Sequence, residues 1–210
     1  MKTKTDKEIL AAYIPNKALD AVISLIHSHE INLNIKKSRT TKLGDFRPPN
    51  NKHAARLSIN YDLNQYAFLI TLIHEIAHWL VWKENNNYKR LNPHGKEWKT
   101  TFQDLMTEFL IPEIFPDTLL RILKKHMQNP KASSSSDIHL VRELKKYDQG
   151  EPALILADLE IGDKFLLKNK AFQIVKKNRS RFLCIDLHSQ KKYLVHSLAE
   201  IQKATNEAFS

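Results

Sequence analysis

Twelve consecutive residues, from Thr71 to Trp82, constrain this chain more than any other stretch. They read T-L-I-H-E-I-A-H-W-L-V-W, and the only ionisable side chains among them are those of His74, Glu75 and His78. On a helix, residues four apart lie one turn above each other on the same face, so the two histidines can bind one metal ion together. Burying the three polar groups among apolar residues without a partner would be costly, and a metal ion supplies that partner.

Glu75 lies one position further round the same helix, where its carboxylate can reach a water molecule in an open metal position and take its proton. The pattern H-E-x-x-H also arises by chance on solvated helices. A solvated helix would show a polar face elsewhere, and this stretch shows almost none. The stretch therefore favours a buried metal-binding helix.

A catalytic zinc site has three protein ligands and one open position, so a third ligand is expected downstream. The best candidate is His94, sixteen residues after His78, in the segment N-P-H-G-K-E-W. Pro93 indicates that a new helix begins nearby, because proline is tolerated in the first helical turn. The alternative is an ordinary loop or capping histidine. Together with the preceding helix, His94 is favoured as the third ligand.

Taken together, H-E-I-A-H at 74–78 and P-H-G-K-E-W at 93–98 resemble the SprT-like metalloproteases, whose pattern is H-E-x-x-H, a loop, and H-G-x-x-aromatic. The resemblance covers residues 31–106. It implies that His74, His78 and His94 bind one catalytic Zn²⁺ and that Glu75 is the catalytic carboxylate. Bacterial members are expected to carry a zinc ribbon built on cysteines. This chain has a single cysteine, Cys184, so it cannot form one.

Composition bounds the remaining possibilities. The 210 residues carry a net charge of +10, which indicates acidic partners, with nucleic acid the first candidate and simple solubility the alternative. One cysteine favours a reducing compartment. No uninterrupted apolar region follows the charged N-terminus, so a signal peptide is not expected, and no apolar run is long enough for a membrane span. We therefore expect a cytoplasmic protein without membrane contact. The oligomeric state stays open.

Before the metal helix, the periodicity predicts two helices and three short strands, an α+β layout of the zincin type. The predicted ranges are Asp6–Tyr13 and Asn16–His29 for the helices, and Ile31–Lys36, Ser38–Phe46 and Ala55–Asn60 for the strands. In such enzymes a substrate chain pairs with an exposed strand edge beside the metal, in a sequence-tolerant way. The third strand is the predicted edge. Asp62 or Asn64 is expected to cap the metal helix.

Beyond the metal helix, the spacing of Trp98, Phe102, Leu105, Met106 and Phe109 predicts a helix that packs against it. Trp98 is expected to support His94 by packing. Three regions follow from the composition: a metalloprotease domain at 1–128, a linker with a short helix at 129–156, and a small β module at 157–210, SH3-like or OB-like. The last contains ten Lys and Arg against six Asp and Glu, a net charge of +4. Its candidate nucleic-acid contacts are Phe172, Arg179, Arg181 and Tyr193.

The predicted function is a zinc metallopeptidase that hydrolyses peptide bonds, with DNA-associated proteins as its substrates. Tyr88 and Arg90, in the loop after the metal helix, are weak candidates for stabilising the oxyanion. One alternative is a non-proteolytic, zinc-stabilised protein that binds nucleic acid, which the intact Glu75 disfavours. Another is a zinc hydrolase of small molecules, which would need a closed pocket rather than an open cleft.

Overall fold

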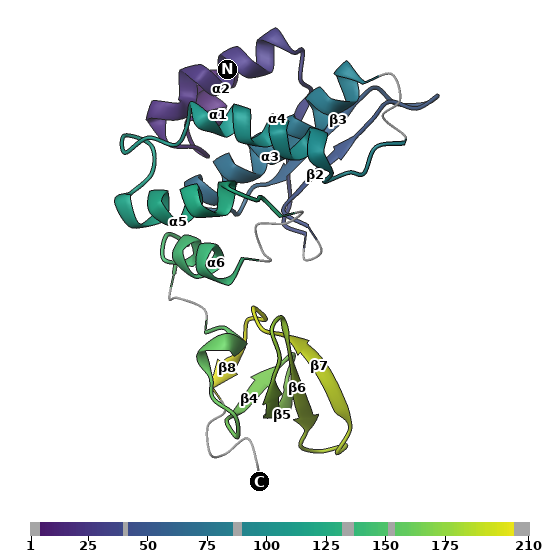
Figure 1. The fold of residues 1–210 in the computed structure, drawn as a ribbon, viewed down its shortest axis with the longest axis vertical. Helices are drawn as coiled ribbons and strands as arrows, with labels where there is room; N and C mark the ends of the chain where they lie inside the picture. The colour runs from purple at the N-terminus through teal and green to yellow at the C-terminus, as the bar shows by residue number, and fades with distance from the viewer. Residues whose placement is uncertain (1–4, 40–41, 86–89, 132–136, 151–153, 204–210) are drawn as a thin grey trace, which may run out of the picture. The chain divides into compact units, whose positions relative to one another are not determined.

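The apolar stretch at 71–82 lies within α3 (Gln65–Glu84), the longest helix of the chain. Its cap is Asn64, whose side chain accepts hydrogen bonds from the backbone N–H groups of Tyr66 and Ala67. The helix is apolar on most sides because a sheet packs on it from one direction and α4 (Lys96–Thr107) from another (Figure 1). The predicted metal helix and the helix that packs against it are thus both present.

The computed structural model describes residues 5–39, 42–85, 90–131, 137–150 and 154–203. The chain divides into two compact units, Met1–Gln149 and Gly150–Ser210. Each unit has its own apolar core. The architecture is a mixture of helix and sheet that agrees with the predicted α+β class.

The sheet of the first unit has three strands in the order β1-β3-β2, namely β1 (Leu33–Lys36), β3 (Arg56–Asn60) and β2 (Gly44–Arg47). β1 runs parallel to β3, and β2 runs antiparallel to it. The third strand is therefore central, and the prediction that it forms the exposed edge is wrong. Its polar residues Ser58 and Asn60 are buried because Arg39 donates hydrogen bonds to both side chains, at 3.0 and 2.8 Å.

Four further helices surround this core. They are α1 (Asp6–Leu10), α2 (Leu19–Ser28), α5 (Asp117–Met127) and α6 (Ile138–Lys145), with a short 3₁₀ turn at Asn16–Ala18. Helix α6 packs against α5, and the side chain of Asn64 donates a hydrogen bond of 2.9 Å to the carbonyl of Leu144. The short helix assigned to a linker at 129–156 is thus part of the first unit. In the described ranges, no helix combines the length and apolar character that a membrane crossing requires.

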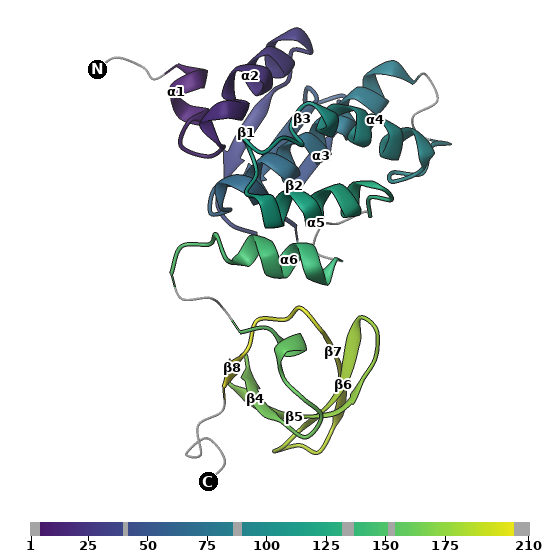
Figure 2. The same cartoon turned by 60° about the vertical axis from the view of Figure 1, so that its left-hand side comes forward.

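The second unit is a five-stranded antiparallel sheet with the order β7-β6-β5-β4-β8. Its strands are β4 (Lys164–Leu167), β5 (Lys170–Lys177), β6 (Arg181–Asp186), β7 (Lys192–His196) and β8 (Gln202–Lys203). Figure 2 shows the sheet curling round on itself. Leu156 belongs to its buried core and Ile155 forms a β-bridge with Glu200, so the unit begins before the predicted residue 157.

Two side chains in that core bear on the predicted chemistry. Phe172 is 6 % exposed and stacks on Phe165 with ring centroids 5.6 Å apart, so it is not available to stack on a base. Cys184 is fully buried, and burial raises the pKa of its thiol to about 11. Arg179, Arg181 and Tyr193 are exposed.

Candidate metal centre

Three histidines from two segments meet above α3. His74 and His78 project from consecutive turns of this helix, and His94 lies in the loop that leads into α4. The Nε2 atom of His94 lies 3.0 Å from Nε2 of His78 and 3.3 Å from Nε2 of His74. The three candidate ligand atoms all lie within 4.8 Å of one another. The structure therefore brings together all three histidines named from the sequence.

The spacing of these nitrogen atoms fits a metal ion. Three nitrogens placed roughly 2.0–2.1 Å from zinc at tetrahedral angles would lie about 3.3 Å apart. Hydrogen bonds alone satisfy the arrangement poorly, because a neutral imidazole has one N–H and Nε2 of His94 faces two other ring nitrogens. A cation placed between them satisfies three lone pairs at once, so the cluster could hold a metal ion.

The protonation of the three rings favours the same use. Burial lowers the pKa of His74 well below its usual value, that of His78 to about 3, and that of His94 to a lesser degree. The proximity of the other histidines lowers the pKa values of His74 and His78 further. Imidazole binds metal ions in its neutral form. The lowered pKa values keep all three rings in this form near neutral pH.

Trp98 forms the floor under the three rings. Its indole is 1 % exposed and lies 4.6, 5.4 and 4.7 Å from the ring centroids of His74, His78 and His94. Its Nε1–H donates a hydrogen bond of 3.3 Å to the backbone carbonyl of His74. The packing predicted for Trp98 against His94 is present and extends to the other two rings.

Glu75 lies beside the histidines, 7 % exposed. Burial raises the pKa of its carboxyl group to about 8, and the negative charge of Asp45 acts in the same direction. A hydrogen bond from the backbone N–H of Phe46 and the charges of Arg39 and Lys42 partly oppose this rise. Asp45 itself is held in the ionised form. Burial alone would raise its pKa, but hydrogen bonds from Lys42 and Arg47, at 2.8 and 2.7 Å, lower it.

Gly44 lets β2 approach α3 at this point. A Cβ atom added to Gly44 would lie 2.6 Å from Oε1 of Glu75, 2.7 Å from its Cγ and 2.8 Å from Cγ2 of Thr71. Only glycine fits between the strand and the carboxyl group. The sequence analysis did not assign Gly44 to the site, although a glycine inside a strand pattern is a signal of close backbone approach.

An open cavity of about 290 Å³ lies over the cluster. It is lined by the three histidines and Glu75, by Pro93, and by Gly44, Asp45 and Phe46 of β2. Among the described strands, β2 ends the sheet, so no further strand lies along its outer edge. Arg90 is exposed and does not line the cavity, and Tyr88 lies outside the described residues.

Comparison with known proteins is consistent with this geometry. A family model described as the SprT-like family matches residues 15–119. Curated proteins named Protein SprT, from Cronobacter sakazakii and Erwinia tasmaniensis, are each 46 % identical to this chain over 44 residues. That stretch is 20 % of this chain and 25 % and 24 % of the two relatives, so the match spans about a quarter of their length. No solved structure gave a significant match.

Proposed function

Because this chain belongs to the SprT-like family and its three histidines converge beside a buried glutamate, we propose that it is a zinc-dependent metallopeptidase with a zincin-like catalytic domain. The single observation that carries the proposal is the convergence of the three Nε2 atoms next to Glu75. A purely structural zinc site is closed by a fourth protein ligand and has no use for a neighbouring carboxylate.

In this proposal His74, His78 and His94 would hold the zinc ion through their Nε2 atoms. The bound ion would polarise the scissile carbonyl and lower the pKa of water toward roughly 7. Glu75 accepts a proton from the attacking water at a carboxylate oxygen and passes it to the leaving amine. A base with a pKa near the working pH both takes and returns a proton readily, and the nearby cation favours its ionised form.

The edge of β2 is the proposed binding site for the substrate backbone. The N–H of Asn60 donates to the carbonyl of Leu43, at 2.9 Å, and this bond fixes the alternation of the antiparallel ladder. Asp45 then turns its peptide groups toward β3, whereas Gly44 and Phe46 turn theirs toward the outer edge, where the N–H of Phe46 already donates to Glu75. An extended peptide paired with that edge would run across the open cavity, and the contacts would be tolerant of sequence.

We further propose that the substrates include proteins bound to nucleic acid. The net charge of +10 supports contact with phosphates. In the second unit, the exposed residues Arg179, Arg181 and Tyr193 are the proposed contacts. The first unit has four cationic residues between positions 36 and 42. Arg39 and Lys42 are engaged by Ser58, Asn60 and Asp45, which leaves Lys36 and Lys37 as the exposed cations of this segment.

The decisive experiment measures metal content and proteolysis together, on the wild type, Glu75→Gln and His94→Ala, with a protein substrate in the presence and absence of DNA. We expect about one zinc per chain in the wild type and in Glu75→Gln, with proteolysis reduced by about 10²-fold or more in Glu75→Gln because an amide cannot take the proton. His94→Ala should lose the zinc.

Two results would contradict the proposal. Undiminished turnover in zinc-loaded Glu75→Gln would exclude Glu75 as the base. Wild-type zinc affinity in His94→Ala would exclude the third ligand.

A further inference from the structure

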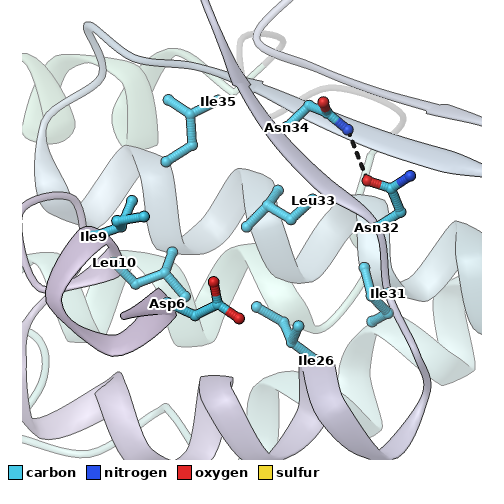
Figure 3. A pocket seen from close by; sticks show the side chains of 9 residues that line it. All are labelled: Asp6, Ile9, Leu10, Ile26, Ile31, Asn32, Leu33, Asn34 and Ile35. Atoms are coloured by element: carbon cyan, nitrogen blue, oxygen red, sulfur yellow. Dashed lines mark hydrogen bonds between the residues drawn. The ribbon is translucent and has the colours of Figure 1, made fainter. Parts of the chain in front are cut away.

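The sheet of the first unit has a second free edge, and a groove of about 440 Å³ lies beside it (Figure 3). This edge is β1, which β3 separates from β2 and from the metal centre. The groove is lined by residues of α1, α2 and the β1 segment: Asp6, Ile9, Leu10, Ile26 and residues 31–35. Its size falls within the range of about 300–1,000 Å³ that ligand sites occupy, and most of its lining is apolar.

The backbone along this edge has unused hydrogen-bonding groups. At the two ends of the β1–β3 ladder, the N–H of Leu57 donates to Asn32 and the N–H of Tyr61 donates to Lys36, at 2.9 and 2.8 Å. Because parallel pairing alternates, Leu33 and Ile35 turn their N–H and C=O groups away from β3. Within the described ranges, neither residue has a backbone hydrogen-bond partner on that side.

The side chains along the edge are sorted between the two faces of the sheet. Leu33 and Ile35 point toward the groove, whereas Asn32 and Asn34 hydrogen-bond to each other, at 3.0 Å, away from it (Figure 3). Ile9, on the opposite wall, is 39 % exposed. A strand added to this edge would therefore pair with the backbone and place every second side chain over apolar residues.

We propose that the β1 edge binds an extended peptide segment of another protein, which adds a strand beside β1 and inserts alternate apolar side chains into the groove. The charged residues at the two ends of the groove specify further which peptide segment would bind. The carboxylate of Asp6 faces the groove near Ile26 and Ile31 in Figure 3. Lys36 and Lys37 are exposed at the other end. The fitting segment is apolar at alternate positions, basic at the Asp6 end and acidic at the lysine end.

A single strand fits this groove better than a second copy of the chain. The groove lies between β1 and α1, so an occupant must be narrow. The β1 edge of a second copy would bring its own α1 to the same place, where the two helices would compete for the space.

The test uses the full chain and two fluorescein-labelled peptides, K-V-T-V-T-V-E and its reversal E-V-T-V-T-V-K, which distinguish parallel from antiparallel pairing. Binding is followed by fluorescence anisotropy, with peptide integrity checked by mass spectrometry. One of the two should bind. Ile9→Lys should weaken that binding by about tenfold or more, because it places a charge in the apolar groove. The matched control is Ile111→Lys, since Ile111 is 38 % exposed and lies outside the groove. It should leave the affinity unchanged.

A second pair of probes tests the backbone pairing. N-methylation of the peptide nitrogens that face β1 should weaken binding by about threefold to tenfold for each hydrogen bond lost, whereas methylation of the alternate set should be tolerated. Binding should also slow amide hydrogen exchange at residues 33 and 35.

Three outcomes would overturn the inference. The first is no binding by either peptide at about 1 mM. The second is a wild-type peptide affinity of the Ile9→Lys variant, provided that this variant has the melting temperature of the wild type. The third is a dimer in sedimentation that Ile9→Lys dissociates, which would identify a second copy as the occupant. None of these depends on zinc or Glu75, so the metallopeptidase proposal stands or falls separately.

Discussion

At the scale of single residues, the candidate site depends on the close approach of β2 to Glu75 as much as on the metal-binding histidines. His74, Glu75, His78 and His94 are recognisable in the sequence because their spacing is that of metal chemistry, and the structure brings them together. The closeness of β2 to Glu75 could not be predicted, because sequence spacing does not specify which strand crosses which helix. It is set by Gly44, to which the sequence analysis gave no role in the site.

Gly44→Ala should therefore impair the site without removing a ligand. The new methyl group would lie within 2.8 Å of atoms of both Glu75 and Thr71, so β2 or the carboxyl group must move. We expect a loss of about 1–3 kcal/mol in the free energy of unfolding, together with strongly reduced peptidase activity and an unchanged zinc content. Urea denaturation and metal analysis separate the two effects. An active, wild-type-stable variant would show that the close approach is dispensable.

The lowered pKa values of the histidines predict how zinc binding depends on pH. Protons compete with a metal only below the pKa of the ligand in the metal-free protein. Ordinary histidines would begin to compete near pH 6.5, but burial lowers the pKa of all three rings, to about 3 for His78. In Glu75→Gln, which removes the coupled titration of the neighbouring carboxyl group, zinc affinity should thus stay nearly constant between about pH 8 and 6 and fall only in more acidic solution. Equilibrium dialysis across this range checks the prediction. A steep fall already between pH 7 and 6 would contradict it.

At the scale of elements, the sequence predicted which segments form strands and helices better than it predicted which of these elements lie side by side. The alternating pattern at 55–60 correctly indicated a strand, but its polar positions looked solvent-exposed. Arg39 covers Ser58 and Asn60, so the strand is buried in the centre of the sheet and β2 takes the edge. A buried polar ladder of this kind depends on a residue distant in sequence, and no local periodicity reveals it. For the same reason α6 was assigned to a linker.

Asn64 contacts both α3 and α6, and its contribution to each helix can be tested separately. Its side-chain oxygen caps α3, while its nitrogen donates to the carbonyl of Leu144 and to Asp148, at 2.9 and 2.6 Å. Asn64→Ala should cost about 1–2 kcal/mol in the free energy of unfolding through loss of the cap.

Asn64→Asp is the matched variant for this test. It keeps the cap but loses both donated bonds and faces Asp148 with a like charge. It should destabilise the contact with α6, measured as faster hydrogen exchange at 138–145, more than it destabilises α3. Exchange at 138–145 as slow in Asn64→Asp as in the wild type would show that the bond to Leu144 does not anchor α6.

At the scale of the whole molecule, the chain has two compact units, each with its own core, so the contribution of each unit can be tested separately. The boundary lies at Gln149/Gly150 rather than at residue 157, because Leu156 packs in the core of the second unit and Ile155 forms a β-bridge with Glu200. The β content of that unit could be predicted from its short apolar runs and turns. The burial of Phe172, which removes it as a base-stacking candidate, could not be predicted, because a buried aromatic residue and an exposed one look alike in a strand pattern.

Deleting residues 150–210 should leave the zinc content unchanged, since all three candidate ligands lie in the first unit. We expect cleavage of DNA-bound protein to fall more than cleavage of a free peptide.

In the full chain, Arg179→Ala with Arg181→Ala should weaken DNA binding alike for all sequences and flatten its salt dependence, by about 0.9 log unit per lost duplex-phosphate contact. Anisotropy titrations at several salt concentrations test this. Equal DNA affinity in the full and shortened chains would assign the contact to the first unit.

The candidate centre is built from imidazoles alone, and this has a consequence for oxidative stress. Peroxide and disulfide exchange act on thiolates, so they have no target among the three histidines. The one thiol of the chain, Cys184, is buried in the other unit and keeps its proton at physiological pH. A centre of this kind responds to acid and to chelators, while a burst of oxidant leaves its donor atoms intact.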